Sequence, residues 1–137
     1  MGQDPANRAY AQLFELSPFP AVVSRLDDHR VLAVNRSAVD VVGVRPADAL
    51  GQPVSGYYVD PAQRLELIDR VRRDGRADNV RLHIRRANGD PFWVLASIRV
   101  IEWNGIPPDV FVGWEADILS FREDPLIAAA LARAKVR

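Results

Sequence analysis

The sequence predicts a single α+β domain in which most helices are grouped between two sets of antiparallel strands. Its 137 residues fit one domain, and 48% of them are hydrophobic, which is enough to build a core without a disulfide or a metal. The apolar residues follow helical spacing in the first half of the chain and alternate with polar residues from residue 77. This change of period separates a helical segment from a later group of strands.

Helix starts and ends are marked by short polar motifs. An acidic residue followed by proline begins a helix at Asp4-Pro5, Asp60-Pro61 and Asp124-Pro125. Asn35 is a favourable N-cap for another helix, and Gly43 ends that helix. The predicted helices cover residues 5–16, 36–42, 46–50, 61–74 and 125–134, and residues 52–59 are expected to be irregular.

Strands are predicted where apolar and polar residues alternate between turn residues. Asn88-Gly89 predicts a tight hairpin, and Asn104-Gly105 predicts a second turn. The Asp27-Asp28-His29 segment predicts the turn between two short early strands. The predicted strands cover residues 21–25, 31–34, 77–85, 92–103 and 110–118.

Composition excludes several classes of function. The chain has no cysteine, which removes thiol nucleophiles, thiolate zinc sites and cysteinyl cofactor links. Lysine and arginine total 18, as do aspartate and glutamate, so the net charge of zero argues against nucleic-acid binding. Between residues 70 and 86 lie seven arginines and two aspartates, which we interpret as a solvated surface, with a binding patch as the alternative. No signal peptide or membrane span is predicted, so we expect a cytoplasmic protein that does not bind membranes.

A series of short motifs runs along the chain: Val34-Asn35-Arg36-Ser37-Ala38 at a helix start, Leu50-Gly51, Asp60-Pro61, residues 86–94 around the Asn88-Gly89 turn, and Glu115-Ala116-Asp117-Ile118. Taken in this order, the motifs resemble those of the PAS domain family over residues 13–118. Each motif alone is common, and their order and spacing carry the resemblance. It implies a five-stranded antiparallel sheet with helices over one face, flanked here by N-terminal and C-terminal helices.

The resemblance also implies a division of the chain and a role. Residues 1–18 are expected to form an N-terminal capping helix, residues 19–119 the PAS-like domain, and residues 120–137 a C-terminal helix leading toward an effector domain. Many relatives have a hydroxyl residue after the closing Asp-Ile pair. This chain has Leu119 there and Ser120 one position later, which puts that form of coupling in doubt.

Cofactors known from related domains are argued against by the residues at the matching positions. Light-sensing relatives carry a cysteine where this chain has Val54, which excludes covalent flavin photochemistry. Haem-binding relatives carry a histidine on the long helix, and residues 60–74 contain none. His29 and His83 are interpreted as surface histidines, and no metal site is predicted. A small ligand bound without a covalent link, including flavin, stays open.

In the PAS family the cavity lies between the long helix and the inner face of the sheet. Family parity points Phe92, Val94, Ala96 and Ile98 inward and leaves Trp93 on the outer face. The orientation of the last strand has two possible readings. Hydrophobicity favours burying Val110, Val112, Trp114, Ala116 and Ile118. The family pattern, which we prefer, instead points Phe111, Gly113 and Glu115 inward.

The predicted ligand-binding residues are Val54, Tyr57, Ile68, Ile84, Val94, Phe111 and Glu115. Glu115 is either a polar anchor for a ligand, with Tyr57 or Tyr58 beside it, or a structural or exposed acid.

A homodimer is predicted through the outer face of the sheet and the N-terminal helix. The alternative for the tryptophans is ordinary core packing, and the C-terminal helix is either a signal helix or a packing appendage. The residues assigned to this dimer and signalling face are Leu13, Phe14, Trp93, Trp114 and Asp117.

The leading hypothesis is a non-enzymatic sensor that binds a small ligand, dimerises, or does both to regulate a signalling effector. The first alternative is a ligand-free dimerisation or protein-interaction module with a filled core. The second is a small enzyme with a conical pocket, for which Asp40, Glu115 and Asp117 are the only candidate acids. None of these three has an evident nucleophile or histidine partner, so no catalytic residue is assigned.

Overall fold

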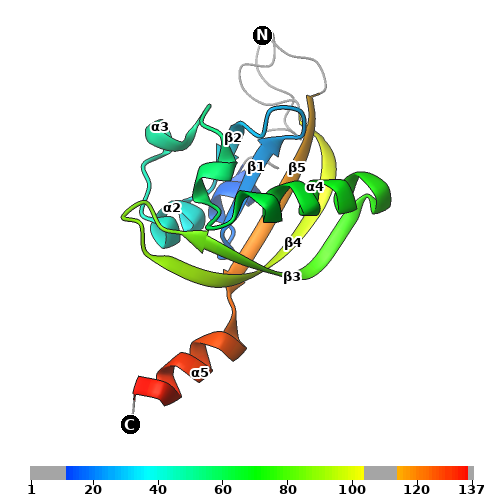
Figure 1. Ribbon diagram of the computed structural model, residues 1–137. Coiled ribbons are helices and arrows are strands. Elements are labelled where there is room, and N and C mark those ends of the chain that lie inside the picture. Colours follow the sequence, from blue (N-terminus) through cyan, green and yellow to red (C-terminus); the bar gives the residue numbers. More distant parts are fainter. Residues whose placement is uncertain (1–11, 104–113, 136–137) are drawn as a thin grey trace.

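A computed structural model describes residues 12–103 and 114–135 of the chain. Its centre is one antiparallel sheet of five strands in the order β2-β1-β5-β4-β3 (Figure 1). The strands are β1 (Ala21–Arg25), β2 (Val31–Val34), β3 (Arg76–Arg85), β4 (Pro91–Trp103) and β5 (Trp114–Glu123). The predicted α+β fold with a five-stranded antiparallel sheet is confirmed.

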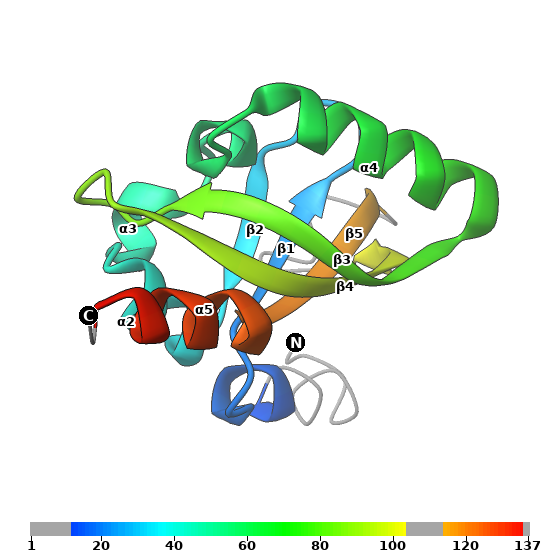
Figure 2. The same ribbon diagram turned by 60° about the horizontal axis from the view of Figure 1, so that its bottom comes forward.

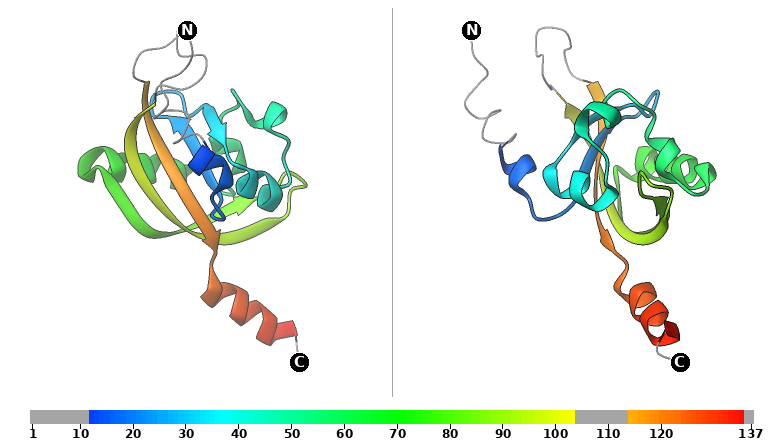
Figure 3. Two further views of the ribbon diagram at one scale, coloured as in Figure 1. Left: turned by 180° about the vertical axis from the view of Figure 1, so that it is seen from behind. Right: turned by 90° about the vertical axis from the view of Figure 1, so that its left-hand side faces the viewer.

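Helices cover one face of this sheet. They are α2 (Arg36–Val42), α3 (Pro46–Ala49), the short 3-10 helix η1 (Val54–Tyr57) and α4 (Pro61–Asp74), which crosses over the strands (Figure 2). Residues 12–16 are helical and lie on the opposite side of the sheet from α4, while α5 (Pro125–Lys135) projects beyond the end of β5 (Figure 3). Residues 12–103 and 114–135 contain no helix that is long and apolar enough to span a membrane.

The predicted capping residues start the helices as expected. The Asn35 side chain accepts a hydrogen bond from the backbone N–H of Ala38, and that of Asp60 accepts one from Ala62, each at 3.0 Å. The Asp124 side chain does the same for Leu126 at 3.0 Å. Gly75 ends α4 with a φ of 79°, in the left-handed region that glycine adopts without strain. Local sequence therefore sets the helix bounds before tertiary packing acts on them.

The side chains of β4 that were predicted to face the helices do so, together with the apolar side chains of β3. Leu82 pairs with Val94 and Ile84 with Phe92, and all four side chains are buried. On the other face His83 pairs with Trp93, and their rings stack at a centroid distance of 4.3 Å. Trp93 therefore lies on the outer face as predicted.

β5 differs from the prediction in length. It continues to Glu123, past the predicted strand end at Ile118 and past the domain boundary predicted at residue 119. Residues 119–122 alternate apolar and polar, which is the pattern of a strand with one buried face. The start of the predicted N-terminal helix and residues 110–113 of the predicted last strand lie outside the described residues.

Candidate ligand cavity and its buried ion pair

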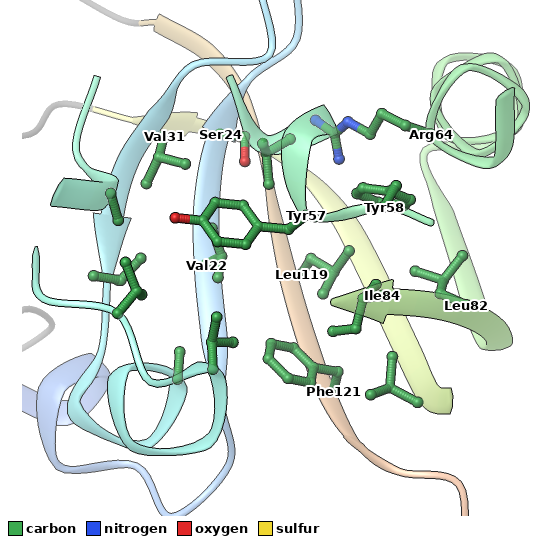
Figure 4. Close-up of a pocket in the computed structure, with 17 residues that line it drawn as sticks. Val22, Ser24, Val31, Tyr57, Tyr58, Arg64, Leu82, Ile84, Leu119 and Phe121 are labelled. Atoms are coloured by element: carbon green, nitrogen blue, oxygen red, sulfur yellow. The ribbon is translucent and has the colours of Figure 1, made fainter. Parts of the chain in front are cut away.

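A cavity of about 60 Å³ lies between the covering helices and the inner face of the sheet (Figure 4). It is lined mainly by aliphatic side chains because each contributing strand turns its apolar set to this face. Strand residues in the lining are Val22, Ser24, Val31, Val34, Leu82, Ile84, Val94, Leu119 and Phe121. Helix and loop residues are Ala38, Val42, Val44, Ala49, Val54, Tyr57, Tyr58 and Arg64.

Arg64 reaches one end of the cavity from α4 (Figure 4), but protein partners occupy its guanidinium and the accessible cavity wall stays apolar. The Arg64 guanidinium donates two hydrogen bonds to the carboxylate of Asp117 on β5, at 2.8 Å and 3.3 Å. The side chains are 1% and 0% exposed, so this is a fully buried ion pair. The pair joins the long helix to the central strand of the sheet.

Two further groups surround the Arg64 guanidinium. Its Nε donates to Nδ1 of His29 at 3.3 Å, and the Tyr58 hydroxyl lies beside it. Burial raises the pKa of Asp117, and the Arg64 cation offsets part of that rise. Burial lowers the pKa of the Arg64 guanidinium, but the Asp117 carboxylate raises that pKa by more. The pKa of Arg64 therefore lies above its usual value. The network therefore has one cation, one anion and neutral neighbours.

His29 is neutral in this arrangement. Its Nδ1 accepts the hydrogen bond from Arg64, so the ring proton is on Nε2. Partial burial lowers the pKa of His29, and the Arg64 cation lowers it further. The interpretation of His29 as a plain surface histidine is therefore wrong. His29 lies in the turn between β1 and β2 with a backbone φ of 62°, and its ring contacts Arg64 of α4.

The cavity contains four of the seven residues predicted to bind a ligand. Val54, Tyr57, Ile84 and Val94 line it. Ile68 is buried under α4 but does not line the cavity, since α4 contributes Arg64 to the lining and Ile68 lies one turn further along the helix.

The other two predicted residues stay predictions. Phe111 lies outside the described residues. The backbone of Glu115 pairs in register with Glu102, and its side chain is outside the described part. The inward parity predicted for the last strand holds where β5 is described, because Leu119 and Phe121 line the cavity while Ile118 is only partly buried.

The assignment of Asp117 to the dimer face is wrong. Its side chain is 0% exposed and paired with Arg64, because odd-numbered residues of β5 point toward the helices. Sequence reasoning missed Arg64 altogether. A signal was present, since Arg64 shares one face of α4 with the buried Leu67, Ile68 and Val71 at spacings of three, four and seven.

The other residues of the predicted dimer face have mixed environments. Leu13 is 68% exposed, Phe14 is partly buried and Trp93 is partly buried against His83. The side chain of Trp114 lies outside the described residues. Within residues 12–103 and 114–135, no group of three histidine, aspartate or glutamate side chains is placed to hold a metal ion.

The fold and the helix-covered cavity define a sensor-type α+β domain, and comparison with known proteins gives its family. Residues 19–118 match the PAS domain family, and the chain belongs to it. PAS domains are sensory and regulatory modules of signalling proteins. No curated protein sequence matches the chain.

Several solved structures share the fold. A PAS domain from a two-component sensor histidine kinase superposes with a TM-score of 0.71 at 16% identity, covering 89% of this chain and 100% of that one. A PAS domain of a LuxR-family transcriptional regulator from Burkholderia thailandensis, in complex with ethanol, gives 0.63 at 20% identity, with 83% and 96% covered. The LOV protein of Rhodobacter sphaeroides gives 0.69 at 18% identity, with 90% and 69% covered.

Replacing Arg64 with alanine is expected to destabilise the domain by roughly 3–5 kcal/mol, because it leaves the Asp117 carboxylate buried and unpaired. The double variant Arg64→Met with Asp117→Leu removes both charges and is expected to recover most of that loss. Urea unfolding of the wild type, the single variant and the double variant measures both effects. A double variant no more stable than Arg64→Ala would contradict the ion-pair explanation.

Stability is expected to fall as the pH drops through the titration of His29. The folded pKa lies below the ordinary value of 6.5, so the unfolded chain binds a proton first. The contribution of His29 to the free energy of unfolding is therefore complete above pH 6.5, and it is lost as the pH falls toward the pKa of His29 in the folded protein. His29→Asn is the control, because asparagine tolerates the positive φ and does not titrate. The free energy of unfolding of the wild type and of His29→Asn is measured from about pH 7.5 to 5. The same pH dependence in both proteins would contradict this role of His29.

Proposed function

We propose that the domain is a non-enzymatic sensor whose interior cavity binds a small, mainly apolar molecule and whose last strand and helix pass the response to an effector. The observation that carries the proposal is the cavity itself, whose walls are almost entirely apolar although Ser24, Tyr58 and Arg64 belong to its lining. A small molecule that is mainly alkyl matches such a lining, since the apolar walls bind its carbon atoms.

The cavity volume restricts the size of this ligand. About 60 Å³ equals roughly two water molecules at their share of ~30 Å³ of liquid volume, far below the ~300 Å³ of typical cofactor pockets. A flavin does not match this volume. The PAS domain from Burkholderia thailandensis, which is in complex with ethanol, supports the choice of short alcohols as first probes.

The route from the cavity to an effector runs along β5. Leu119 and Phe121 line the cavity, and the same strand leads to Asp124 at the start of α5. Asp124 is buried, caps α5 and pairs with Arg81 of β3 at 2.6 Å. A ligand that moves β5 therefore acts on the base of α5, whose helix points away from the sheet (Figure 1). An effector domain as partner and a cytoplasmic location stay our predictions.

A ligand-free dimerisation module is the second candidate, favoured by the small cavity and by exposed apolar side chains. Near the N-terminus Leu13, Leu16 and Phe19 are 68%, 79% and 60% exposed. On α5, Leu126 and Leu131 are 67% and 58% exposed. Such side chains are typical of surfaces that a second chain covers.

An enzyme has less support. Asp117 is occupied by Arg64 in the interior, whereas Asp40 is exposed on α2 and pairs with Arg36 at 3.2 Å. These two carboxylates therefore do not converge on one pocket. The side chain of Glu115 lies outside the described residues.

Short alcohols are expected to raise the melting temperature of the wild type, because a ligand that binds only the folded state stabilises it, by roughly 2.7 kcal/mol at a hundred times Kd. Ethanol and 1-butanol are the probes, in the millimolar range. Ala38→Val fills the cavity and is expected to abolish the shift, whereas Ala77→Val, at a buried alanine outside the lining, should retain it. The same response in both variants would count against ligand binding in the cavity.

Leu13→Glu combined with Leu16→Glu is expected to convert a dimer into a monomer, because charge on the N-terminal helix cannot be buried in an interface. Leu65→Glu on α4, at a leucine that is 58% exposed, is the matched control and should remain dimeric. Sedimentation equilibrium measures all three proteins. A wild type that is monomeric at high concentration would rule out the predicted homodimer.

A further inference from the structure

A second hollow, a surface cleft of about 460 Å³, lies beside the interior cavity. It is formed by the α2–α3 connection, by η1 and by the β3–β4 hairpin. The residues that give it chemical character are Arg45, Asp48, Tyr57, Arg85 and Arg86. Three positive charges face one negative charge, which leaves a local excess of two in a chain whose net charge is zero.

The three arginine side chains of the cleft differ in the contacts that their guanidinium groups already make. Arg86 is held in place by neutral groups, since it donates to the carbonyl of Val41 at 2.6 Å and lies 3.9 Å from the ring centroid of Phe92. Arg45 pairs with Asp48 at 2.8 Å, but both side chains are largely exposed, at 83% and 53%, so the pair is weak. Arg85 is exposed at the end of β3. The cleft can therefore present at least two guanidinium groups to an anion.

Tyr57 and Val44 line both the cleft and the interior cavity. Figure 4 shows the Tyr57 ring lying across the cavity from η1. Burial raises the pKa of the Tyr57 hydroxyl, and the Asp48 carboxylate beside the cleft adds to the rise, so the phenol is neutral. Tyr57 and Val44 therefore lie at the boundary between the apolar cavity and the cationic surface cleft.

We infer that the cleft binds the carboxylate head of a small amphiphilic acid whose alkyl tail passes Tyr57 into the interior cavity. The inference rests on the proposed function, because it takes the cavity as the sensor site and names the ligand class. The cavity alone is far below the ~300–1,000 Å³ of small-molecule sites, whereas the adjoining cleft, at about 460 Å³, lies within that range. A planar carboxylate matches the two parallel donors of a guanidinium group, which favours an acid over a neutral alcohol.

The test is calorimetric titration of the full chain with butanoate, hexanoate and octanoate, and with the neutral probes 1-butanol and 1-octanol. The cleft variant is Arg45→Gln with Arg85→Gln. The matched control is Arg36→Gln with Arg70→Gln, because Arg36 lies in an exposed pair with Asp40, like Arg45 with Asp48, and Arg70 is exposed like Arg85. Both double variants change the net charge by the same amount, so the control reports any effect of net charge alone.

Octanoate affinity is expected to fall by about tenfold in the cleft variant, since two exposed charge contacts to the carboxylate are lost. The control is expected to match the wild type, and the affinity for 1-octanol should be the same in all three proteins. Affinity should rise with tail length in the wild type until the tail exceeds the cavity, and Ala38→Val should reduce that rise by taking up cavity volume.

Three results overturn the inference. Equal losses in the cleft variant and the control indicate a general charge effect. Binding of 1-octanol as tight as that of octanoate, with no effect of the arginine changes, leaves the sensor cavity in place but removes the acid-binding cleft. No binding of any acid or alcohol overturns both the cleft and the ligand-binding part of the proposed function.

Discussion

The buried ion pair between Arg64 and Asp117 is the interaction on which the cavity depends. It fixes α4, the longest of the helices over the inner face, to β5, the central strand of the sheet, at one point 53 residues apart in sequence. Two charges with no exposure to water are tolerated only when each satisfies the other, so the helix cannot shift along the strand without a large cost. The position of α4 over the sheet is therefore fixed by electrostatics as well as by packing.

Most of the fold could be predicted because its signals are local. Asp60-Pro61, Asp124-Pro125 and Asn35 set helix starts, and alternation in β3 and β4 set which side chains face the core. The partnership of Arg64 with Asp117 could not be predicted, because spacing along a chain carries no information on which helix residue meets which strand residue. The position of Arg64 on the buried face of α4 was readable, and so was the alternation that extends β5 to Glu123. Of the four cavity residues that were predicted, Val94 rests on family parity, Ile84 on alternation, and Val54 and Tyr57 on the irregular segment, whereas Ile68 was misplaced by one helical turn.

The two hollows of the domain differ in chemistry, and Val44 and Tyr57 line both of them. The cavity has aliphatic walls, whereas the cleft has three arginines and one aspartate. Tyr57 suits the boundary because its ring is apolar and its hydroxyl is polar. The segment that appeared irregular in sequence contains a short 3-10 helix, η1, and backbone hydrogen bonds from Val54 to His29 and from Val59 to His83 anchor it to the sheet and its first turn.

The cap at Asp124 gives α5 a defined angular register. Its carboxylate accepts hydrogen bonds from the first turn of the helix and is tied to Arg81 of β3, so the first residues of α5 have a fixed direction relative to the sheet. Each residue of an α-helix turns the next one by about 100° around the axis. One residue inserted between Leu126 and Leu131 leaves the first leucine in place and swings the second by more than a quarter turn. The rotational position of each residue about the axis of α5 therefore decides, together with the composition of the helix, which side chains lie on the same face as Leu126.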